Sequence, residues 1–128
     1  MCGICGILNL NGAPVHVSDI RPMTDAMAHR GPDDEGMFLD GSVGLGHRRL
    51  SIIDLSAAGH QPMFNEDRTI ALVFNGEVYN FRELRHHLEG LGHVFSSQTD
   101  TEVVIHAYES WGEKCVLRLN GMFAFGLW

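Results

Sequence analysis

An uninterrupted apolar run at residues 121–128 is the feature that most limits how this chain can fold. Such a run is typical of a β-strand buried on both faces, which fits a layered domain. Chain ends normally lie at the surface and not inside a buried strand. We therefore expect the domain to continue past Trp128, so that residues 1–128 are part of a longer polypeptide.

The remaining segments follow the order strands, then helices, then a strand. Alternation and turn residues predict strands at residues 2–10, 37–39, 43–47, 48–53, 69–74 and 94–95. Apolar periodicity and caps at Ser18, Asn80 and Thr99 predict helices at residues 19–29, 80–90, 100–111 and 113–119. Residues 54–61 are predicted as a polar loop, and Glu102 is expected to complete a capping box with Thr99. This order fits an α+β fold better than strict βαβ alternation.

Composition restricts the partners that the chain can have. With 128 residues, 45% of them hydrophobic and 20% charged, the chain suits one globular domain. A formal net charge of −7 argues against a nucleic-acid partner, which needs clustered basic residues. The sequence has no apolar run of membrane-spanning length and no basic-then-apolar leader. Since the three cysteines are odd in number and no leader is present, we expect reduced thiols and a cytoplasmic location.

Cys2 directly follows the initiator Met1, and this position suggests chemistry. If Met1 is removed, Cys2 carries both a nucleophilic thiol and an α-amine that titrates near roughly pH 8 and can act as its base. The alternative is an ordinary buried cysteine at the start of a strand. Cys2 and Cys5 form a C-x-x-C pair, but no helix start or further ligand at matched spacing accompanies it, so no metal ligand is predicted.

Three further sites have both a structural and a functional interpretation. Adjacent Arg48 and Arg49 on a strand point to opposite faces, so one can clamp a carboxylate while the other stays at the surface. Asn75 and Gly76 form a favoured hairpin turn or, at a strand end, an oxyanion hole. Asp100 in the first turn of a helix complements the helix dipole or accepts a substrate ammonium group. Together with Cys2 these groups fit a free α-amino acid whose side-chain carbonyl is attacked, and glutamine is that substrate.

Six stretches then resemble one family throughout the chain, in order. They are MCGICG (1–6), HRGPD (29–33), GHRRLSIID (46–54), QPM (61–63), FNGEVYN (74–80) and TDTE (99–102). The chain resembles the class II glutamine amidotransferase domain, an N-terminal-nucleophile hydrolase, and looks most like its asparagine-synthetase branch.

The resemblance implies a fold and a set of roles. The fold is a four-layer αββα sandwich of two mostly antiparallel sheets, truncated here on its C-terminal side. Cys2 matches the nucleophile, and Asn75 and Gly76 match the oxyanion hole. Arg49 matches the group that binds the substrate α-carboxylate, whereas Glu77 and Asp100 match the acceptors of its α-ammonium group.

The partners implied are L-glutamine and a C-terminal synthetase domain that receives ammonia through an internal tunnel. ATP and Mg²⁺ are cofactors of that second domain, and none is expected in residues 1–128. The sequence leaves open the acceptor, a homodimer, the removal of Met1, and whether these residues are active alone. Three alternatives also remain open. The first is another class II member, including those that act on cell-wall or polysaccharide precursors. The second is a non-catalytic amino-acid-binding or interaction module, and the third is a metal-binding domain through Cys2, Cys5 and nearby histidines.

Overall fold

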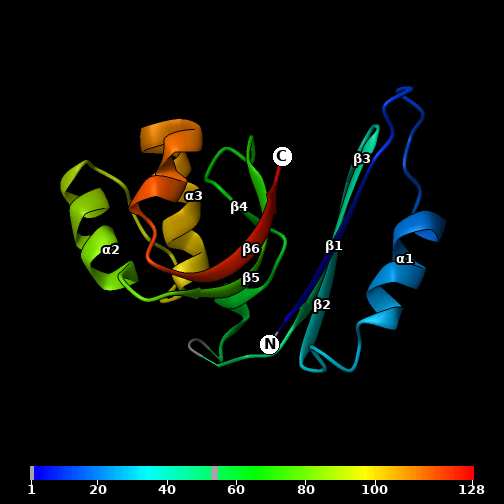
Figure 1. The fold of residues 1–128 in the computed structure, drawn as a ribbon, viewed down its shortest axis with the longest axis horizontal. Helices are drawn as coiled ribbons and strands as arrows, with labels where there is room; N and C mark the ends of the chain where they lie inside the picture. Colours follow the sequence, from blue (N-terminus) through cyan, green and yellow to red (C-terminus); the bar gives the residue numbers. More distant parts are fainter. Residues whose placement is uncertain (1, 53–54) are drawn as a thin grey trace.

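The computed structural model describes residues 2–52 and 55–128, and its elements form four layers (Figure 1). One sheet has the order β1-β3-β2, made of Gly3–Leu8, Val43–Arg49 and Asp34–Asp40, and the other has the order β4-β5-β6, made of Met63–Phe64, Ala71–Val78 and Gly121–Leu127. Helix α1 (Val17–Ala26) covers the outer face of the first sheet. Helices α2 (Phe81–Gly90) and α3 (Asp100–Trp111) cover the outer face of the second. Each strand pairing among the described residues is antiparallel. The predicted αββα sandwich is therefore confirmed.

Two apolar clusters hold the layers together. Between the sheets lie Val43, Leu45, Ala71 and Val73. The larger cluster joins the second sheet to α2 and α3, with members that include Leu72, Phe74, Leu88, Val104 and Ile105. Because side chains alternate along β5, Leu72 and Phe74 face the helices while Ala71 and Val73 face the first sheet. This alternation fixes which residues of β5 point into each layer.

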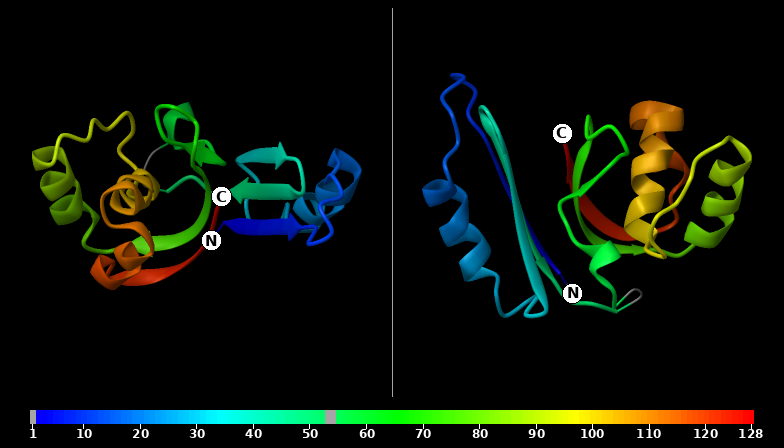
Figure 2. Two further views of the ribbon diagram at one scale, coloured as in Figure 1. Left: turned by 90° about the horizontal axis from the view of Figure 1, so that it is seen from above. Right: turned by 180° about the vertical axis from the view of Figure 1, so that it is seen from behind.

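The start of β1 lies next to the segment that leads from β3 to β4 (Figures 1 and 2). A contact fixes this arrangement, because the Leu50 N–H lies 3.4 Å from Cys2 Sγ. Met1, Ile53 and Asp54 fall outside the described residues. The expectations that depend on them, the removal of Met1 and the last residues of the 46–54 motif, remain predictions.

The strands differ from the sequence-based expectations in several places. β6 is confirmed, but it is not buried on both faces, because Met122, which is 65% exposed, and Ala124 alternate with half-buried residues along the strand. β3 ends at Arg49 and does not continue to Ile52. Residues 94–95 are not a strand, and the loop at 54–61 contains a short 3₁₀ helix at Ala57–Gly59. The two-residue β4 was not predicted, because it is too short to show a period.

The helices lie close to where the sequence places them, but the first spans Val17–Ala26 and does not reach residue 29, and two of the expected caps are wrong. α1 begins after His16 and not after Ser18, and Asp19 accepts a hydrogen bond from the His16 N–H. Asn80 does precede α2, yet its side chain pairs with Arg118 and Asn120 instead of capping the helix. The segment predicted as a helix at 113–119 is a 3₁₀ helix at Gly112–Arg118.

Thr99 does cap α3, accepting a hydrogen bond from the Glu102 N–H at 3.3 Å. The Glu102 carboxylate does not complete the capping box and instead accepts from Ser96 and Ser97. In the part of the chain that the structure describes, no helix is both long and apolar enough to cross a membrane.

Candidate active site

One cavity of about 140 Å³ brings together all the site residues expected from the sequence. A single water needs roughly 10–15 Å³, so a small organic molecule fits the space. The predicted residues that line it are Cys2, Arg49, Asn75, Gly76, Glu77 and Asp100. They come from the chain start, from β3, from β5 and from the first turn of α3. These elements are far apart in sequence, so the fold alone brings them together.

The Cys2 thiol is half-buried at one edge of this cavity. The Leu50 N–H points at Sγ from 3.4 Å, and an N–H in this position interacts favourably with negative charge on sulfur. Arg30 Nε donates to the Cys2 carbonyl oxygen at 3.1 Å. The backbone of Cys2 is thereby held by one arginine while its side chain faces the cavity.

The two adjacent arginines point to opposite sides of β3, as predicted. Arg48 forms ion pairs with Asp25 and Glu35 at 2.8 and 2.7 Å, on the side of α1 and β2. Arg49 is buried and lines the cavity, and its Nη1 donates to the Ser56 carbonyl oxygen at 2.9 Å. Its guanidinium lies against Gly59, where any Cβ would overlap it. Glycine at position 59 is therefore a steric requirement of this arginine position.

Asn75 and Gly76 lie inside β5, and neither of the expected alternatives, a hairpin turn or a strand end, is correct. Pairing with β6 continues through Gly76 opposite Phe123 to Val78. A Cβ at position 76 would overlap the Met122 carbonyl oxygen and the Phe123 backbone, so only glycine permits this close approach. Asn75 Oδ1 is buried and has no hydrogen-bond partner among the described residues. Asn75 also lines the cavity, so its side-chain NH₂ is the group that can donate to a ligand there.

Asp100 is a buried carboxylate that opens into the cavity from the start of α3. Its Oδ2 accepts a hydrogen bond from the Val78 N–H at 2.8 Å. Burial raises the pKa of Asp100 above its ordinary value, the Val78 hydrogen bond opposes this shift, and the charge of Glu77 adds to it. Since Glu77 also lines the cavity, two carboxylates face the same space, and a cationic group between them would be favourable.

Two residues of the site were not assigned a role from the sequence, although both lie in the motifs quoted above. Gln61 is buried and lines the cavity. Its Oε1 accepts from the Phe74 N–H at 2.6 Å, and its Nε2 donates to Thr101 Oγ1 at 3.3 Å. Gln61 thus connects β5 to α3 where β4 no longer pairs with β5.

His47 contacts the carbonyl group of Phe74, the β5 residue whose N–H is bound by Gln61. Its Nε2 lies 3.2 Å from the Phe74 carbonyl oxygen, and the ring is fully buried. Burial lowers the pKa of His47 to about 4, against the smaller effects of Phe74 and Asp34. The ring is therefore neutral near pH 7 and must carry its proton on Nε2 to donate to the carbonyl. Gln61 and His47 together hold the backbone immediately before Asn75.

The other cysteines take no part in this site. Burial raises the pKa of the Cys5 and Cys115 thiols, as expected for residues of the core. All three cysteines are free. Within the described ranges, one group of side chains has metal-ligand geometry, and it contains none of the cysteines but His93, His106 and Glu109.

Comparison with known proteins agrees with the geometry. A family model described as a glutamine amidotransferase domain matches residues 1–128. "Asparagine synthetase [glutamine-hydrolyzing] 1" of Bacillus subtilis is 44% identical over 131 residues, which cover 100% of this chain and 21% of that protein. "Asparagine synthetase [glutamine-hydrolyzing] 3" of Arabidopsis thaliana is 42% identical and is covered to 22%. The chain thus spans about a fifth of the length of these relatives.

A solved structure supports the same assignment of the fold. The glutamine phosphoribosylpyrophosphate amidotransferase from B. subtilis aligns with a TM-score of 0.58 and 26% sequence identity. The alignment covers 70% of this chain and 22% of that one. None of these comparisons assigns roles to individual residues, so the roles of the cavity residues remain predictions.

Proposed function

We propose that this chain, which belongs to the glutamine amidotransferase domain family, hydrolyses the side-chain amide of L-glutamine to glutamate and ammonia. The observation that carries the proposal is the convergence of a thiol, a buried guanidinium, an amide and two carboxylates on one cavity. These are the groups needed to bind a zwitterionic amino acid and to attack its side-chain carbonyl.

The cavity has groups that match both charges of the substrate backbone. Arg49 binds the α-carboxylate, because a guanidinium held by Ser56 and packed on Gly59 presents a preorganised fork of donors. Asp100 and Glu77 accept the α-ammonium group, which also relieves the repulsion between their own charges. With both ends held, the side chain of glutamine extends toward Cys2.

Cys2 supplies the nucleophile. Its thiolate attacks the amide carbon, forming a C–S bond, while the Asn75 side-chain NH₂ and the Gly76 N–H bind the oxyanion. The C–N bond then breaks, and the α-amine of Cys2 returns the thiol proton to the departing ammonia. Water hydrolyses the thioester to glutamate and restores the thiol. The scheme requires removal of Met1, since only then is the α-amine of Cys2 free.

For the complete protein we propose glutamine-dependent synthesis of asparagine. The names of the curated relatives support this assignment. A synthetase domain would activate the carboxylate of aspartate with ATP and Mg²⁺ and receive ammonia through an internal tunnel. We further propose a cytoplasmic location, consistent with the free cysteines.

A different acceptor of ammonia is the second candidate. The structural neighbour is named as a phosphoribosylpyrophosphate amidotransferase, so the same fold serves other acceptors. Cell-wall and polysaccharide precursors belong to this class as well. The two candidates share the glutaminase step and differ only in the acceptor that receives the ammonia.

Ammonia release from glutamine tests the glutaminase step, with the N-terminus checked by mass spectrometry. Protein that begins at Cys2 should release ammonia, whereas protein that retains Met1 and a Cys2→Ala variant should not. Cys5→Ala is the matched control, because Cys5 lies three positions away and outside the cavity. Undiminished activity of Cys2→Ala would remove the basis of the proposal, and inactivity of the mature protein would favour a non-catalytic module.

A further inference from the structure

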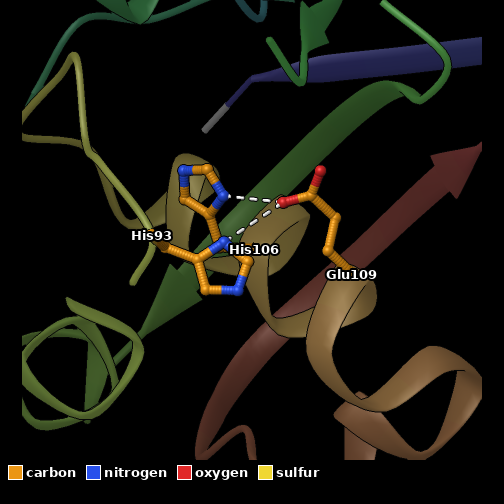
Figure 3. Close-up of side chains that lie close together, drawn as sticks. All are labelled: His93, His106 and Glu109. Carbon is orange, nitrogen blue, oxygen red and sulfur yellow. Dashed lines mark hydrogen bonds and ion pairs between the residues drawn. The ribbon is translucent and has the colours of Figure 1, made fainter. Parts of the chain in front are cut away.

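Three side chains converge away from the cavity, at the far half of α3. His93 lies in the segment after α2, and His106 and Glu109 lie one helical turn apart on α3. Figure 3 shows both rings facing the same carboxylate oxygen: Glu109 Oε2 lies 2.8 Å from His106 Nδ1 and 3.4 Å from His93 Nδ1. One ligand atom from each side chain lies within 4.8 Å of the others. Two imidazoles and a carboxylate are a common donor set for a divalent metal.

Two of the three side chains hold an outer hydrogen-bond partner with the atom that points away from this centre. His93 Nε2 lies 2.7 Å from Ser110 Oγ. Glu109 Oε1 accepts from Asn65 Nδ2 at 2.9 Å. His106 Nε2 faces Glu102 Oε1 at 3.8 Å, an ion-pair separation longer than a hydrogen bond. Metal-binding histidines characteristically direct their second ring nitrogen at a carboxylate or hydroxyl, which orients the ring.

The surroundings of His106 favour a positive charge on its ring or on an ion bound to it. Its Nε2 is buried without a hydrogen-bond partner among the described residues, and it lies 3.8 Å from the Glu102 carboxylate, which can only accept when it is ionised. A neutral ring that donates from Nδ1 to Glu109 would turn the lone pair of Nε2 toward that carboxylate. An ion bound at Nδ1 instead leaves the proton on Nε2, directed at Glu102. A second proton on the ring is the alternative source of charge.

We propose that His93 Nδ1, His106 Nδ1 and Glu109 Oε2 bind one divalent transition-metal ion of the Zn²⁺ class. Three protein ligands leave one tetrahedral position for water. The His93 and Glu109 side chains are 19% and 22% exposed, so an ion can enter from solvent. The ion would join the segment after α2 to α3, the helix whose first turn lines the cavity. The site is independent of glutamine hydrolysis.

Titration of the full, metal-free chain with Zn²⁺ tests the proposal, with calorimetry for affinity and elemental analysis for stoichiometry. We expect one Zn²⁺ per chain and a thermal midpoint that rises with Zn²⁺. His93→Asn and Glu109→Gln should each lower the affinity by more than about 100-fold, since loss of a mere outer partner already costs about 10–100-fold. Ser110→Ala, which removes only the outer partner of His93, should fall within that smaller range.

Two exposed residues provide matched controls. His86→Asn on α2 and Glu113→Gln after α3 change the same residue types outside the cluster, and both should bind Zn²⁺ as the parent chain does. Equal affinity of the parent, His93→Asn and Glu109→Gln would overturn the proposal. So would the absence of Zn²⁺ binding by the parent chain, and a doubly protonated His106 ring by NMR would then show that a proton supplies the charge. Should His93→Asn fail to fold, Ser110→Ala and Glu109→Gln still decide the outcome.

Discussion

Asp100 and Glu102 are buried carboxylates two positions apart on α3, yet the protein surrounds them differently. Glu102 accepts four hydrogen bonds, from the N–H and the hydroxyl groups of both Ser96 and Ser97, at 2.6–2.8 Å. Asp100 opens into the cavity beside Glu77, and its carboxylate accepts from Val78. Burial raises the pKa of Glu102, but the hydrogen bonds from Ser96 and Ser97 and the nearby His106 ring outweigh this effect and lower the pKa to about 2. The pKa of Asp100 is raised, mainly by burial.

The difference separates a carboxylate that stabilises the fold from one that is available to a ligand. Glu102 has donors on both oxygens, so its charge is already compensated within the protein. Asp100 carries a charge that burial disfavours, and a substrate ammonium group would compensate it. Substitutions on the two sides should therefore affect different quantities: the free energy of unfolding around Glu102, and catalysis or substrate binding around Asp100.

The largest effect is expected on the cavity side, for Asn75→Ala. Loss of one oxyanion donor should lower kcat for glutamine hydrolysis by about 10²–10³-fold. The free energy of unfolding should not fall correspondingly, because the substitution also removes a buried oxygen that has no partner among the described residues. Steady-state kinetics and denaturant unfolding of the same preparation measure both quantities. A fall in stability that accounts for the lost activity would contradict the proposed role.

Glu102→Gln should affect stability instead. Lowering the pKa from 4.5 to about 2 corresponds to a stabilisation of the order of 3 kcal/mol. Because the folded-state pKa is depressed, this stabilisation is present above pH 4.5 and is lost as the pH falls through about 2. Urea unfolding from pH 7 to pH 2 should show the parent chain losing this advantage over Glu102→Gln in acid. A constant difference across that range would contradict the assignment.

Asp100→Asn should show the opposite pattern. The amide oxygen can still accept from Val78, so stability should not decrease, while the KM for glutamine should rise by about 10–100-fold with a smaller change in kcat. Burial raises the pKa of Asp100 above its ordinary value of 3.8, so protonation of this carboxylate begins at a higher pH than usual. As the pH falls, the KM of the parent enzyme for glutamine should therefore begin to rise at a pH above 3.8. The variant should lack this dependence. An unchanged KM would place the ammonium site elsewhere.

The smallest effect is expected for Gln61→Ala, which removes the connection between β5 and α3. Leaving the Phe74 N–H without its acceptor should lower the free energy of unfolding by about 1–2 kcal/mol. We also expect kcat to fall by about 10-fold, because the backbone before Asn75 loses one of its two side-chain contacts. Gln98→Ala, at an exposed position, is the control and should change neither by much. Equal behaviour of the two variants would show that Gln61 does not position the site.

The sequence predicted the layers and the identity of the cavity residues better than it predicted local boundaries. Strand alternation was enough to place Arg48 and Arg49 on opposite faces of β3. The position of Asn75 and Gly76 was misjudged, because an Asn-Gly pair favours a turn locally. The pairing with β6, more than 40 positions away in sequence, overrides this preference and needs glycine at position 76.

Buried polar contacts were the least predictable part. Gln61, His47 and Glu102 are buried through partners in other segments, and neither apolar periodicity nor capping patterns report such pairings. Glu102 has the spacing of a capping box with Thr99, but Ser96 and Ser97 provide more donors and bind its carboxylate instead.

The central claim is that the Cys2 thiol attacks a glutamine side chain held in the cavity. Covalent labelling by a glutamine-like electrophile, located by peptide mass spectrometry in protein that begins at Cys2, tests it most directly. The account predicts one label per chain, on Cys2, with excess glutamine slowing the labelling and Asp100→Asn weakening that protection. Labelling of Cys5 or Cys115 instead, or labelling of Cys2 that glutamine does not slow, would contradict it.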